Sequence, residues 1–376
     1  MSYDFEPYPF EKLRSLLEDV QPNADKTPIN LHIGEPQFQT PKAILEVLSA
    51  HNALFNKYPL SGGIPKLKEA QISFVDRRFG VKLTSDQIAP TLGTREALFN
   101  LPQCLLFGKD KSTIAYPNPF YQIYEGAAKA SRAQSVLLNL EAANSFKPDI
   151  TDPRLKNCDL VILNSPNNPT GSVLTLEEMI EWAKLSEKYG FVLLNDECYS
   201  EIYFTAPPPS LLEAAKAIGN DNFSNILVVN SLSKRSSAAG IRSGFIAGDK
   251  VILSKYATYR SYAGITAGIP LQIAAAYAWL EDKHSEEIRL KYAVNMRFAQ
   301  DTLNIKTPES TFYLWLEAKD DLKAAHELYE RYALKTLPGT FLSRGKSPLG
   351  FIRIALVYEE NETIEALNRL KEFFAP

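Results

Sequence analysis

The sequence predicts an α/β protein with one large domain and a smaller α+β domain packed on it. Through the first two thirds of the chain, short apolar runs alternate with segments of helical periodicity. This alternation is typical of a sheet covered by helices on both faces. Near the C-terminus two further apolar runs are each followed by an amphipathic helix. With 376 residues, 45% of them hydrophobic, the chain is long enough to bury cores of this size.

Five apolar runs are the predicted strands of the large domain. They lie at 112–116, 159–164, 191–195, 225–230 and 243–247. The run at 191–195 is almost continuously apolar, as expected of a central parallel strand covered on both faces. Helices are expected at 8–20, 41–55, 65–78 and 175–189, and two more are expected to begin at Thr94 or Arg95 and at Pro119.

The second domain is predicted from the C-terminal third. A long helical region at 267–303, broken near 282–285, leads to strands at 310–318 and 350–357 and helices at 319–333 and 361–374. We therefore expect three parts. They are an N-terminal arm with part of the small domain (1–40), a large cofactor-binding domain (41–270) and a small C-terminal domain (271–376).

Charge and composition favour a small-molecule partner. The net charge of −3 leaves no basic field to recruit nucleic acid or an anionic membrane. The three cysteines are odd in number and widely spaced, which favours buried free thiols in a reducing compartment. No apolar run of about 18 residues and no secretory signal is present, so a cytoplasmic protein is expected. The four histidines lack metal-ligand spacing, and no metal is expected.

Lys234 is the first candidate for chemistry. A lone lysine is usually a solvated surface charge, but this one follows an apolar strand that ends near Val229. It should therefore emerge at the carboxyl edge of the sheet, where α/β proteins bind their ligands. Ser231 and Ser233 add hydroxyl donors, and Arg242 can grip a phosphate with two N–H groups. An amine beside a phosphate cradle is what pyridoxal phosphate requires.

Other strand ends supply residues that suit the same cofactor. The turn at Gly93 and Thr94 opens a helix whose free N–H groups can bind an anion. Tyr121 can stack on a flat ring, although a core tyrosine would look the same. Asn168 sits on a rigid turn between Asn and Pro. Asp196 ends a buried strand and needs a cationic partner, which a protonated pyridine nitrogen would provide.

Taken together, these motifs resemble the class I and II aminotransferases of the fold type I pyridoxal-phosphate enzymes. The resemblance covers nearly the whole chain and implies a mostly parallel, seven-stranded sheet. The motifs that carry it are IGEP with Gly34, Tyr58 before a Gly-Gly hinge, GTR at 93–95, PFY at 119–121, NNPTG at 167–171, DECY at 196–199, SLSKR at 231–235, Arg242 and Arg353.

The resemblance implies roles for the residues around the cofactor ring. Lys234 would hold the cofactor as a Schiff base and then move the proton at the substrate α-carbon. Asp196 would keep the pyridine nitrogen protonated, and Tyr121 would stack on the ring. Asn168 and Tyr199 would donate hydrogen bonds to the ring oxygen.

The resemblance also implies roles at the two ends of the site. The phosphate would be held by the backbone at Gly93, Thr94 and Arg95, by Ser231, Ser233 and Arg242, and by Tyr58 of a neighbouring subunit. Arg353 would bind the substrate α-carboxylate beside Asn168 and the Gly34 loop. A homodimer with shared active sites is therefore expected.

Longer phrases narrow the resemblance further. TLGTREALFNL, NPFYQIYEGAA and DECYSEIYF are similar to the N-succinyldiaminopimelate aminotransferases of bacterial lysine biosynthesis. The implied reaction exchanges an amino group between N-succinyl-LL-2,6-diaminopimelate and 2-oxoglutarate. Candidates for holding the acyl arm are Arg260, Tyr262 and Arg344, which we expect in loops facing the site.

Several alternatives remain open at this point. One is an aminotransferase for acetylated diaminopimelate, aspartate or an aromatic amino acid, and another is a lyase that uses the same cofactor. A third is a non-catalytic regulator that binds pyridoxal phosphate. Regulators of this kind carry a DNA-binding domain before the fold, whereas only about 30 residues precede the motifs here.

Overall fold

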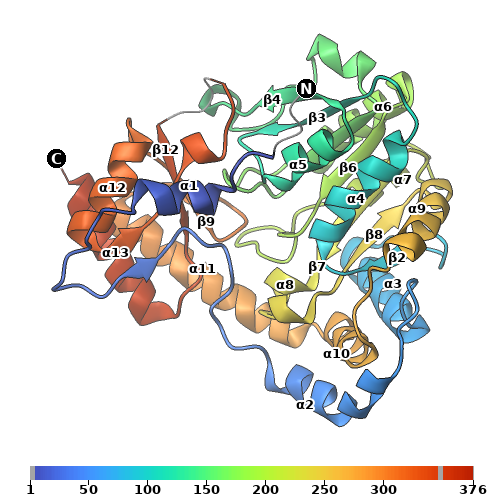
Figure 1. Ribbon diagram of the computed structural model, residues 1–376, viewed down its shortest axis with the longest axis horizontal. Coiled ribbons are helices and arrows are strands. Elements are labelled where there is room, and N and C mark those ends of the chain that lie inside the picture. Colours follow the sequence, from blue (N-terminus) through green and yellow to red (C-terminus); the bar gives the residue numbers. More distant parts are fainter. Residues whose placement is uncertain (1–4, 346–349, 376) are drawn as a thin grey trace.

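The large domain is built on a seven-stranded sheet. A computed structural model describes residues 5–345 and 350–375. Within it the strands are ordered β2-β8-β7-β6-β5-β3-β4, and only β8 runs antiparallel to its neighbours (Figure 1). The strands are β2 (Ile88–Thr91), β3 (Thr113–Asn118), β4 (Gln134–Asn139), β5 (Leu160–Asn164), β6 (Val192–Asp196), β7 (Ile226–Ser231) and β8 (Gly244–Gly248). The predicted mostly parallel α/β sheet is confirmed.

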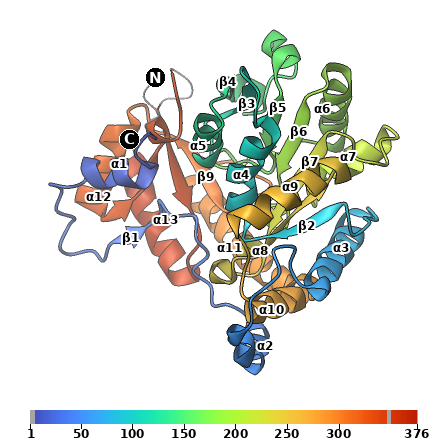
Figure 2. The ribbon, with the colours of Figure 1, turned by 45° about the vertical axis from the view of Figure 1, so that its right-hand side comes forward.

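Helices cover both faces of this sheet (Figure 2). One face packs against α3 (Pro65–Phe79), α6 (Leu176–Tyr189), α7 (Leu211–Ala217) and α10 (Ile269–Leu280), with α2 (Lys42–Ala50) outside α10. The other face packs against α4 (Thr94–Leu106), α5 (Ile123–Ala130) and α9 (Lys250–Ala263). Val161 and Leu163 of β5 enter the first core, whereas Leu160 and Ile162 enter the second. A strand that is buried on both faces is expected to be a nearly continuous apolar run, and residues 160–163 of β5 are all apolar.

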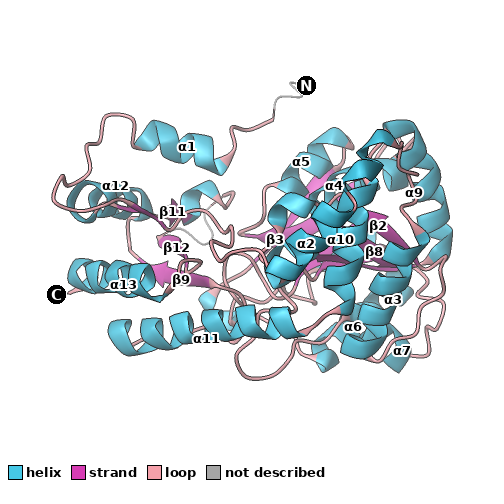
Figure 3. Ribbon diagram, turned by 90° about the horizontal axis from the view of Figure 1, so that it is seen from below, coloured by secondary structure: helices cyan, strands magenta, loops and turns pink. Residues whose placement is uncertain are grey.

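The small domain has its own antiparallel sheet and its own core. Its sheet has the order β11-β12-β9, and a short parallel pair joins β1 to β10. These strands are β1 (Ile29–Asn30), β9 (Tyr313–Glu317), β10 (Leu334–Lys335), β11 (Leu337–Pro338) and β12 (Phe351–Ala355). The helices are α11 (Lys283–Leu303), α12 (Asp321–Tyr332) and α13 (Glu360–Phe374). Figure 3 shows α11 alongside α13. The end of α11 that lies beyond α13 extends toward the large domain.

The N-terminal helix α1 (Pro9–Leu16) lies against the small domain (Figure 3). Leu13 packs with Leu337 and Leu342, which follow β10 in the chain. The segment just before α1 is thereby held near the carboxyl edge of the large sheet. Nowhere in 5–345 or 350–375 is a helix both long and apolar enough to cross a membrane.

Three expectations about elements need correction. Helix α5 begins at Ile123, so Tyr121 precedes the helix instead of lying in its first turn. The helix expected at 41–55 divides into α2 and a 3₁₀ turn at Asn52–Asn56. Arg260 and Tyr262 lie on α9 and not in a loop.

The domain boundaries at 40/41 and 270/271 stay a prediction. The packing of α10 favours a later boundary, because Trp279 belongs to the core of the large domain. Its ring centroid lies 4.9 Å from that of Phe74 and 5.3 Å from that of Phe245. A boundary between α10 and α11, near 281–283, leaves this core intact.

Candidate active site

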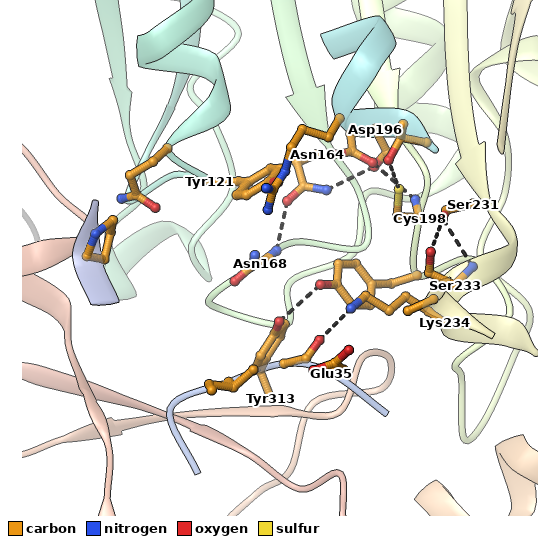
Figure 4. Close-up of a pocket in the computed structure, with 18 of the residues that line it drawn as sticks. Glu35, Tyr121, Asn164, Asn168, Asp196, Cys198, Ser231, Ser233, Lys234 and Tyr313 are labelled. Atoms are coloured by element: carbon orange, nitrogen blue, oxygen red, sulfur yellow. Dashed lines mark hydrogen bonds between the residues drawn. The ribbon is translucent and has the colours of Figure 1, made fainter. Parts of the chain in front are cut away.

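One cavity of about 450 Å³ lies where the carboxyl ends of β5, β6 and β7 face the small domain (Figure 4). Twelve of the residues singled out in the sequence line it. They are Gly34, Thr94, Arg95, Tyr121, Asn168, Asp196, Tyr199, Ser231, Ser233, Lys234, Arg242 and Arg353. Two of the residues predicted to bind the cofactor do not line it: Gly93 lies directly beside Thr94, and Tyr58 is 100% exposed on the single chain.

Lys234 reaches this cavity from the short helix α8 (Leu232–Arg235), directly after β7. Ser231 begins that helix, and its side chain accepts a hydrogen bond from the backbone N–H of Ser233 at 3.2 Å. The Lys234 Nζ donates to the carbonyl oxygen of Gly34. Burial lowers the pKa of the Lys234 amine below its ordinary value. A lysine with a lowered pKa is more often neutral, and the neutral amine can act as a nucleophile and as a base.

Asp196 is a buried carboxylate without a cationic partner among the described residues. Its Oδ2 accepts a hydrogen bond from the Tyr124 hydroxyl at 2.8 Å, and its Oδ1 accepts one from the backbone N–H of Cys198 at 3.2 Å. Burial raises the pKa of Asp196, because the charged form loses its hydration. A cation that enters the cavity beside Asp196 would remove this penalty.

The start of α4 forms a cradle for an anion. Thr94 is the first residue of this 13-residue helix, so the N–H groups of its first turn have no intrahelical acceptor. Gly93 adopts a φ of 74°, and a Cβ there would lie 2.4 Å from Nη2 of Arg242. A side chain at Gly93 would therefore push Arg242 away from the cradle. The hydroxyls of Ser231 and Ser233, 3.0 Å apart, face the same side of the cavity.

Arg353 of β12 lies at the opposite, small-domain side of the cavity. Its Nη1 donates to Oδ1 of Asn168 at 2.9 Å, and its Nη2 donates to the carbonyl oxygen of His32 at 2.6 Å. Its guanidinium carbon lies 4.4 Å from the ring centroid of Tyr313. The Nε is buried and has no hydrogen-bond partner among the described atoms. This fixed cation with an unused N–H suits a carboxylate.

These residues fit pyridoxal phosphate. Asp196 lacks only a cation, which the pyridine nitrogen would supply, and the free N–H groups at Thr94 need an anion, which the phosphate would supply. Tyr121 presents its ring to the cavity and accepts a hydrogen bond at its hydroxyl from the Arg95 Nε at 2.7 Å. When bound, the cofactor supplies an electron sink for charge that develops at the substrate α-carbon.

Comparison with known proteins assigns the family. The model of the family "Aminotransferase class I and II" matches residues 26–370. The chain belongs to the class I and II aminotransferases. These enzymes depend on pyridoxal phosphate, so this chain is a pyridoxal-phosphate-dependent transaminase.

Solved structures of two aminotransferases share the whole fold. Aminotransferase AspB from Helicobacter pylori is 47% identical, with a TM-score of 0.96 over 98% of this chain and 99% of that one. An aminotransferase from Neisseria meningitidis is 38% identical, with a TM-score of 0.93 over 99% and 98% of the two chains. Among curated proteins, the LL-diaminopimelate aminotransferase of Natranaerobius thermophilus is 29% identical over 98% of this chain and 97% of its own length.

The residues expected to hold the acyl arm do not line the cavity of the single chain, and their role stays a prediction. Arg260 is buried and pairs with Glu96, with an Nε to Oε1 distance of 2.8 Å. Tyr262 is 90% exposed on α9. Arg344 pairs with Glu125 at 2.6 Å. Two of these three are engaged in ion pairs that a sequence without contacts cannot reveal.

Several contributors to the site were missed in the sequence, three of them beside predicted residues. Tyr124 and Cys198 hydrogen-bond to the Asp196 carboxylate, and Tyr313 contacts Arg353. A signal existed for Tyr124, because it lies on the first turn of a helix next to the predicted Tyr121. Tyr313 belongs to the phrase STFYLWL, but an aromatic residue at the start of a strand is usually core.

Proposed function

We propose that this aminotransferase exchanges an amino group between N-succinyl-LL-2,6-diaminopimelate and 2-oxoglutarate. In this proposal Lys234 holds the cofactor and moves the proton at the substrate α-carbon, and Arg353 binds the α-carboxylate. Asp196 neutralises the pyridine nitrogen. Two observations support the proposal. The sequence phrases described above are similar to those of the succinyldiaminopimelate enzymes, and the relatives include LL-diaminopimelate aminotransferases.

The observation that carries the choice of substrate is a second cation in the cavity. Arg95 lines the cavity, and its only hydrogen bond among the described residues runs from Nε to the Tyr121 hydroxyl. It has no carboxylate partner there, so both Nη groups are free to bind one. The hydroxyl of Tyr8, which also lines the cavity, is buried without a partner. Arg95 and Tyr8 together offer donors for a second carboxylate.

The two proposed substrates share the feature that such a subsite recognises. 2-Oxoglutarate has an α-carboxylate for Arg353 and one further carboxylate. N-succinyl-LL-diaminopimelate has an α-carboxylate for Arg353 and two further carboxylates, one at its acylated amino-acid end and one at the end of the succinyl arm. In this proposal Arg95 binds the side-chain carboxylate of 2-oxoglutarate and the succinyl carboxylate. The succinyl arm is the longer of the two, and the flexible arginine side chain can adjust to both lengths. Aromatic amino acids lack the second carboxylate and would leave the Arg95 guanidinium unpaired in the complex.

A second candidate donor is LL-diaminopimelate itself, which keeps a free ammonium group at its far end. Glu35 lines the cavity, and its carboxylate has no hydrogen-bond or ion-pair partner among the described residues. This carboxylate could bind an ammonium group. Acylation removes that charge, so the two donors differ in the group that would meet Glu35.

The test is steady-state formation of glutamate from 2-oxoglutarate with a panel of amino donors. The panel contains N-succinyl-LL-diaminopimelate, its N-acetyl analogue, LL-diaminopimelate, aspartate and tyrosine. We expect the highest kcat/KM for the succinylated donor, by about tenfold over the acetylated one, because only the former carries a carboxylate at the end of its acyl arm for Arg95 to bind. Higher kcat/KM for any other donor would overturn the substrate assignment.

Replacing Arg95 tests the second subsite directly. In Arg95→Leu we expect KM for 2-oxoglutarate to rise about tenfold or more while KM for pyruvate, which has one carboxylate, changes by less than about twofold. In Arg95→Lys, which keeps the positive charge, KM for 2-oxoglutarate should rise less than in Arg95→Leu. Equal losses for both keto acids would contradict a role for the Arg95 side chain in binding the second carboxylate.

A further inference from the structure

Tyr313 lines the cavity from the small domain (Figure 4). It is the first residue of β9, and its side chain is 2% exposed. β9 and β12 are antiparallel, with Tyr313 opposite Ala355, so Tyr313 and Arg353 are diagonal neighbours on one face of the sheet. The position of Tyr313 is therefore coupled to that of the carboxylate-binding arginine.

The backbone that precedes Tyr313 is held in place by the large domain. Thr311 has a φ of 72°, a left-handed conformation that is unfavourable for a β-branched residue. Its N–H donates to the carbonyl oxygen of Ile202, in the loop after β6, at 2.9 Å. The Thr311 Oγ1 in turn accepts a hydrogen bond from the N–H of Tyr313 at 3.2 Å. Such strain persists only where the surroundings enforce it, and here it directs the tyrosine at the site.

The hydroxyl and the ring of Tyr313 make two separate contacts with the site. The hydroxyl lies 3.1 Å from the hydroxyl of Tyr199, which also faces the cavity. The ring centroid lies 4.4 Å from the guanidinium carbon of Arg353. Each contact involves a residue with its own role in the proposed reaction, Tyr199 at the ring oxygen of the cofactor and Arg353 at the substrate.

The absence of a side chain at Gly34 leaves the space that the Tyr313 hydroxyl occupies. A Cβ on Gly34 would lie 1.8 Å from the hydroxyl oxygen of Tyr313, so any side chain there would displace the ring. The Gly34 carbonyl oxygen accepts the hydrogen bond of the Lys234 Nζ. The glycine of the IGEP turn is therefore required by Tyr313 as well as by any substrate that approaches the loop.

We propose that Tyr313 is a positioning residue with two independent functions. Its hydroxyl donates to the oxygen of Tyr199, which leaves the Tyr199 proton directed at the cofactor. Its ring is the platform that holds the Arg353 guanidinium in place for the α-carboxylate. The proposal rests on the transaminase reaction and not on the identity of the amino donor.

The hydroxyl is tested in the holoenzyme of Tyr313→Phe. The expected result is a rise of about 0.5 pH unit in the midpoint of the pH titration of the cofactor's visible absorbance, because Tyr199 becomes a weaker donor. We also expect kcat to fall about threefold while KM for 2-oxoglutarate stays within about twofold of wild type. An unchanged or lower midpoint would overturn the proposed donation to Tyr199.

The ring is tested by comparing Tyr313→Leu with Tyr313→Phe. Glutarate carries the two carboxylates of glutamate without its amino group, so its binding reports on carboxylate recognition without turnover. We expect its Kd to rise about tenfold in Tyr313→Leu and less than about twofold in Tyr313→Phe. Equal Kd values in the two variants would contradict a role for the ring. Should Tyr313→Leu not fold, the absorbance midpoint of Tyr313→Phe still decides the first function.

Tyr292→Phe is the matched control. Tyr292 is also fully buried in the small domain, but its hydroxyl has no hydrogen-bond partner among the described residues and it does not line the cavity. Removal of the Tyr292 hydroxyl should change neither the absorbance midpoint of the cofactor nor the Kd for glutarate. A shift as large as that of Tyr313→Phe would show that any buried tyrosine has this effect and would overturn the assignment.

Discussion

Two neighbouring carboxylates at the end of β6 show how the surroundings of a residue decide its role. The Glu197 Oε1 accepts hydrogen bonds from Asn195, from Ser210 and from the backbone N–H of Leu211 at the start of α7. Asp196 lacks such a helix terminus, and its carboxylate faces the cavity. Glu197 is therefore held within the fold through its Oε1, although its Oε2 is buried without a hydrogen-bond partner among the described atoms and burial raises the pKa of this carboxyl to about 8. Asp196 can instead be reached by a ligand in the cavity. The sequence DECY alone does not distinguish the two.

Asp196→Asn should separate stability from cofactor binding. In the ligand-free chain, burial raises the pKa of Asp196, so the folded state favours the protonated form. The stability of the wild-type apoprotein should consequently fall as pH rises from the unfolded-state value of Asp toward this raised pKa, and then level off. Asparagine carries no charge that must be buried, so the Asp196→Asn apoprotein should not lose stability in this way as pH rises. We expect a more stable apoprotein at pH 8, by about 1 to 2 kcal/mol.

The same variant should bind pyridoxal phosphate more weakly and turn over at least about tenfold more slowly, because the pyridine nitrogen loses its counter-charge. Urea unfolding of the apoproteins at pH 5 and pH 8, together with cofactor titration, measures both effects. An apoprotein destabilised at pH 8, or one that binds the cofactor as tightly as wild type, would contradict this account of Asp196.

At the scale of the elements, a buried carboxylate on α4 links the start of this helix to α9. Glu96 lies in the first turn of α4, two residues after Thr94, and is 8% exposed. Its Oε1 accepts hydrogen bonds from the Tyr256 hydroxyl at 2.7 Å and from the Arg260 Nε at 2.8 Å, both on α9. Its Oε2 accepts the backbone N–H of Leu92 at 2.9 Å. This carboxylate ties the anion cradle to α9.

Removing the charge of Glu96 should be costly. In Glu96→Gln the guanidinium of Arg260, which is 2% exposed, stays buried without its counter-charge. Breaking a buried pair in this way costs about 3 to 5 kcal/mol of unfolding free energy. Cofactor affinity should fall as well, since the cradle loses its anchor. Chemical denaturation of the apoprotein measures the first effect.

Glu181→Gln is the control for this experiment, because Glu181 pairs with Lys184 on the surface of α6, where both side chains are more than half exposed. Loss of an exposed pair should change the unfolding free energy by less than about 1 kcal/mol. If Glu96→Gln is no more destabilising than this control, the Glu96–Arg260 pair is not a support of the cradle.

The central elements were predictable from sequence because their burial leaves a clear pattern. β5, β6 and β7 each begin with a continuous apolar run, Asp196 is the last residue of β6, and Lys234 lies on the short helix that follows β7. β4 was not predicted. It pairs only with β3 at the edge of the sheet, and three of its six residues are exposed, so its hydrophobic pattern is weak. The short β10 and β11, of two residues each, depend on tertiary pairing and leave no periodic signal.

At the scale of the whole molecule, the cavity combines the carboxyl edge of one sheet with residues from the other domain. Arg353 and Tyr313 come from the small domain, whereas Lys234 and Asp196 come from the large one. Which residues meet across a domain interface depends on how two independent cores pack together. Residue periodicity does not encode that packing, so Tyr313 was missed while the strand-end residues Asp196 and Lys234 were found.

The single chain also carries a surface that suits a second copy. Tyr58 is 100% exposed, and Leu60 and Phe55 are 72% and 61% exposed in the same segment. Exposed apolar groups of this size usually mark an interface. We propose that the enzyme is a homodimer in which Tyr58 reaches the phosphate cradle of the partner subunit. Enzymes of this family are typically homodimers.

Mixing two variants tests whether Tyr58 acts across the dimer. Lys234→Ala removes the amine from its own site, and Tyr58→Ala should weaken cofactor binding at the partner's site. In a mixed dimer one site then has both residues intact. At a limiting concentration of pyridoxal phosphate, a one-to-one mixture after subunit exchange should regain about one quarter of wild-type activity.

Mixing Lys234→Ala with Arg353→Ala is the control and should regain none, since both residues line the same chain's cavity. No recovery in the first mixture, although exchange is shown by mass spectrometry, would place Tyr58 outside the partner's site. Recovery in the control would show instead that Lys234 and Arg353 of one chain do not act in the same site.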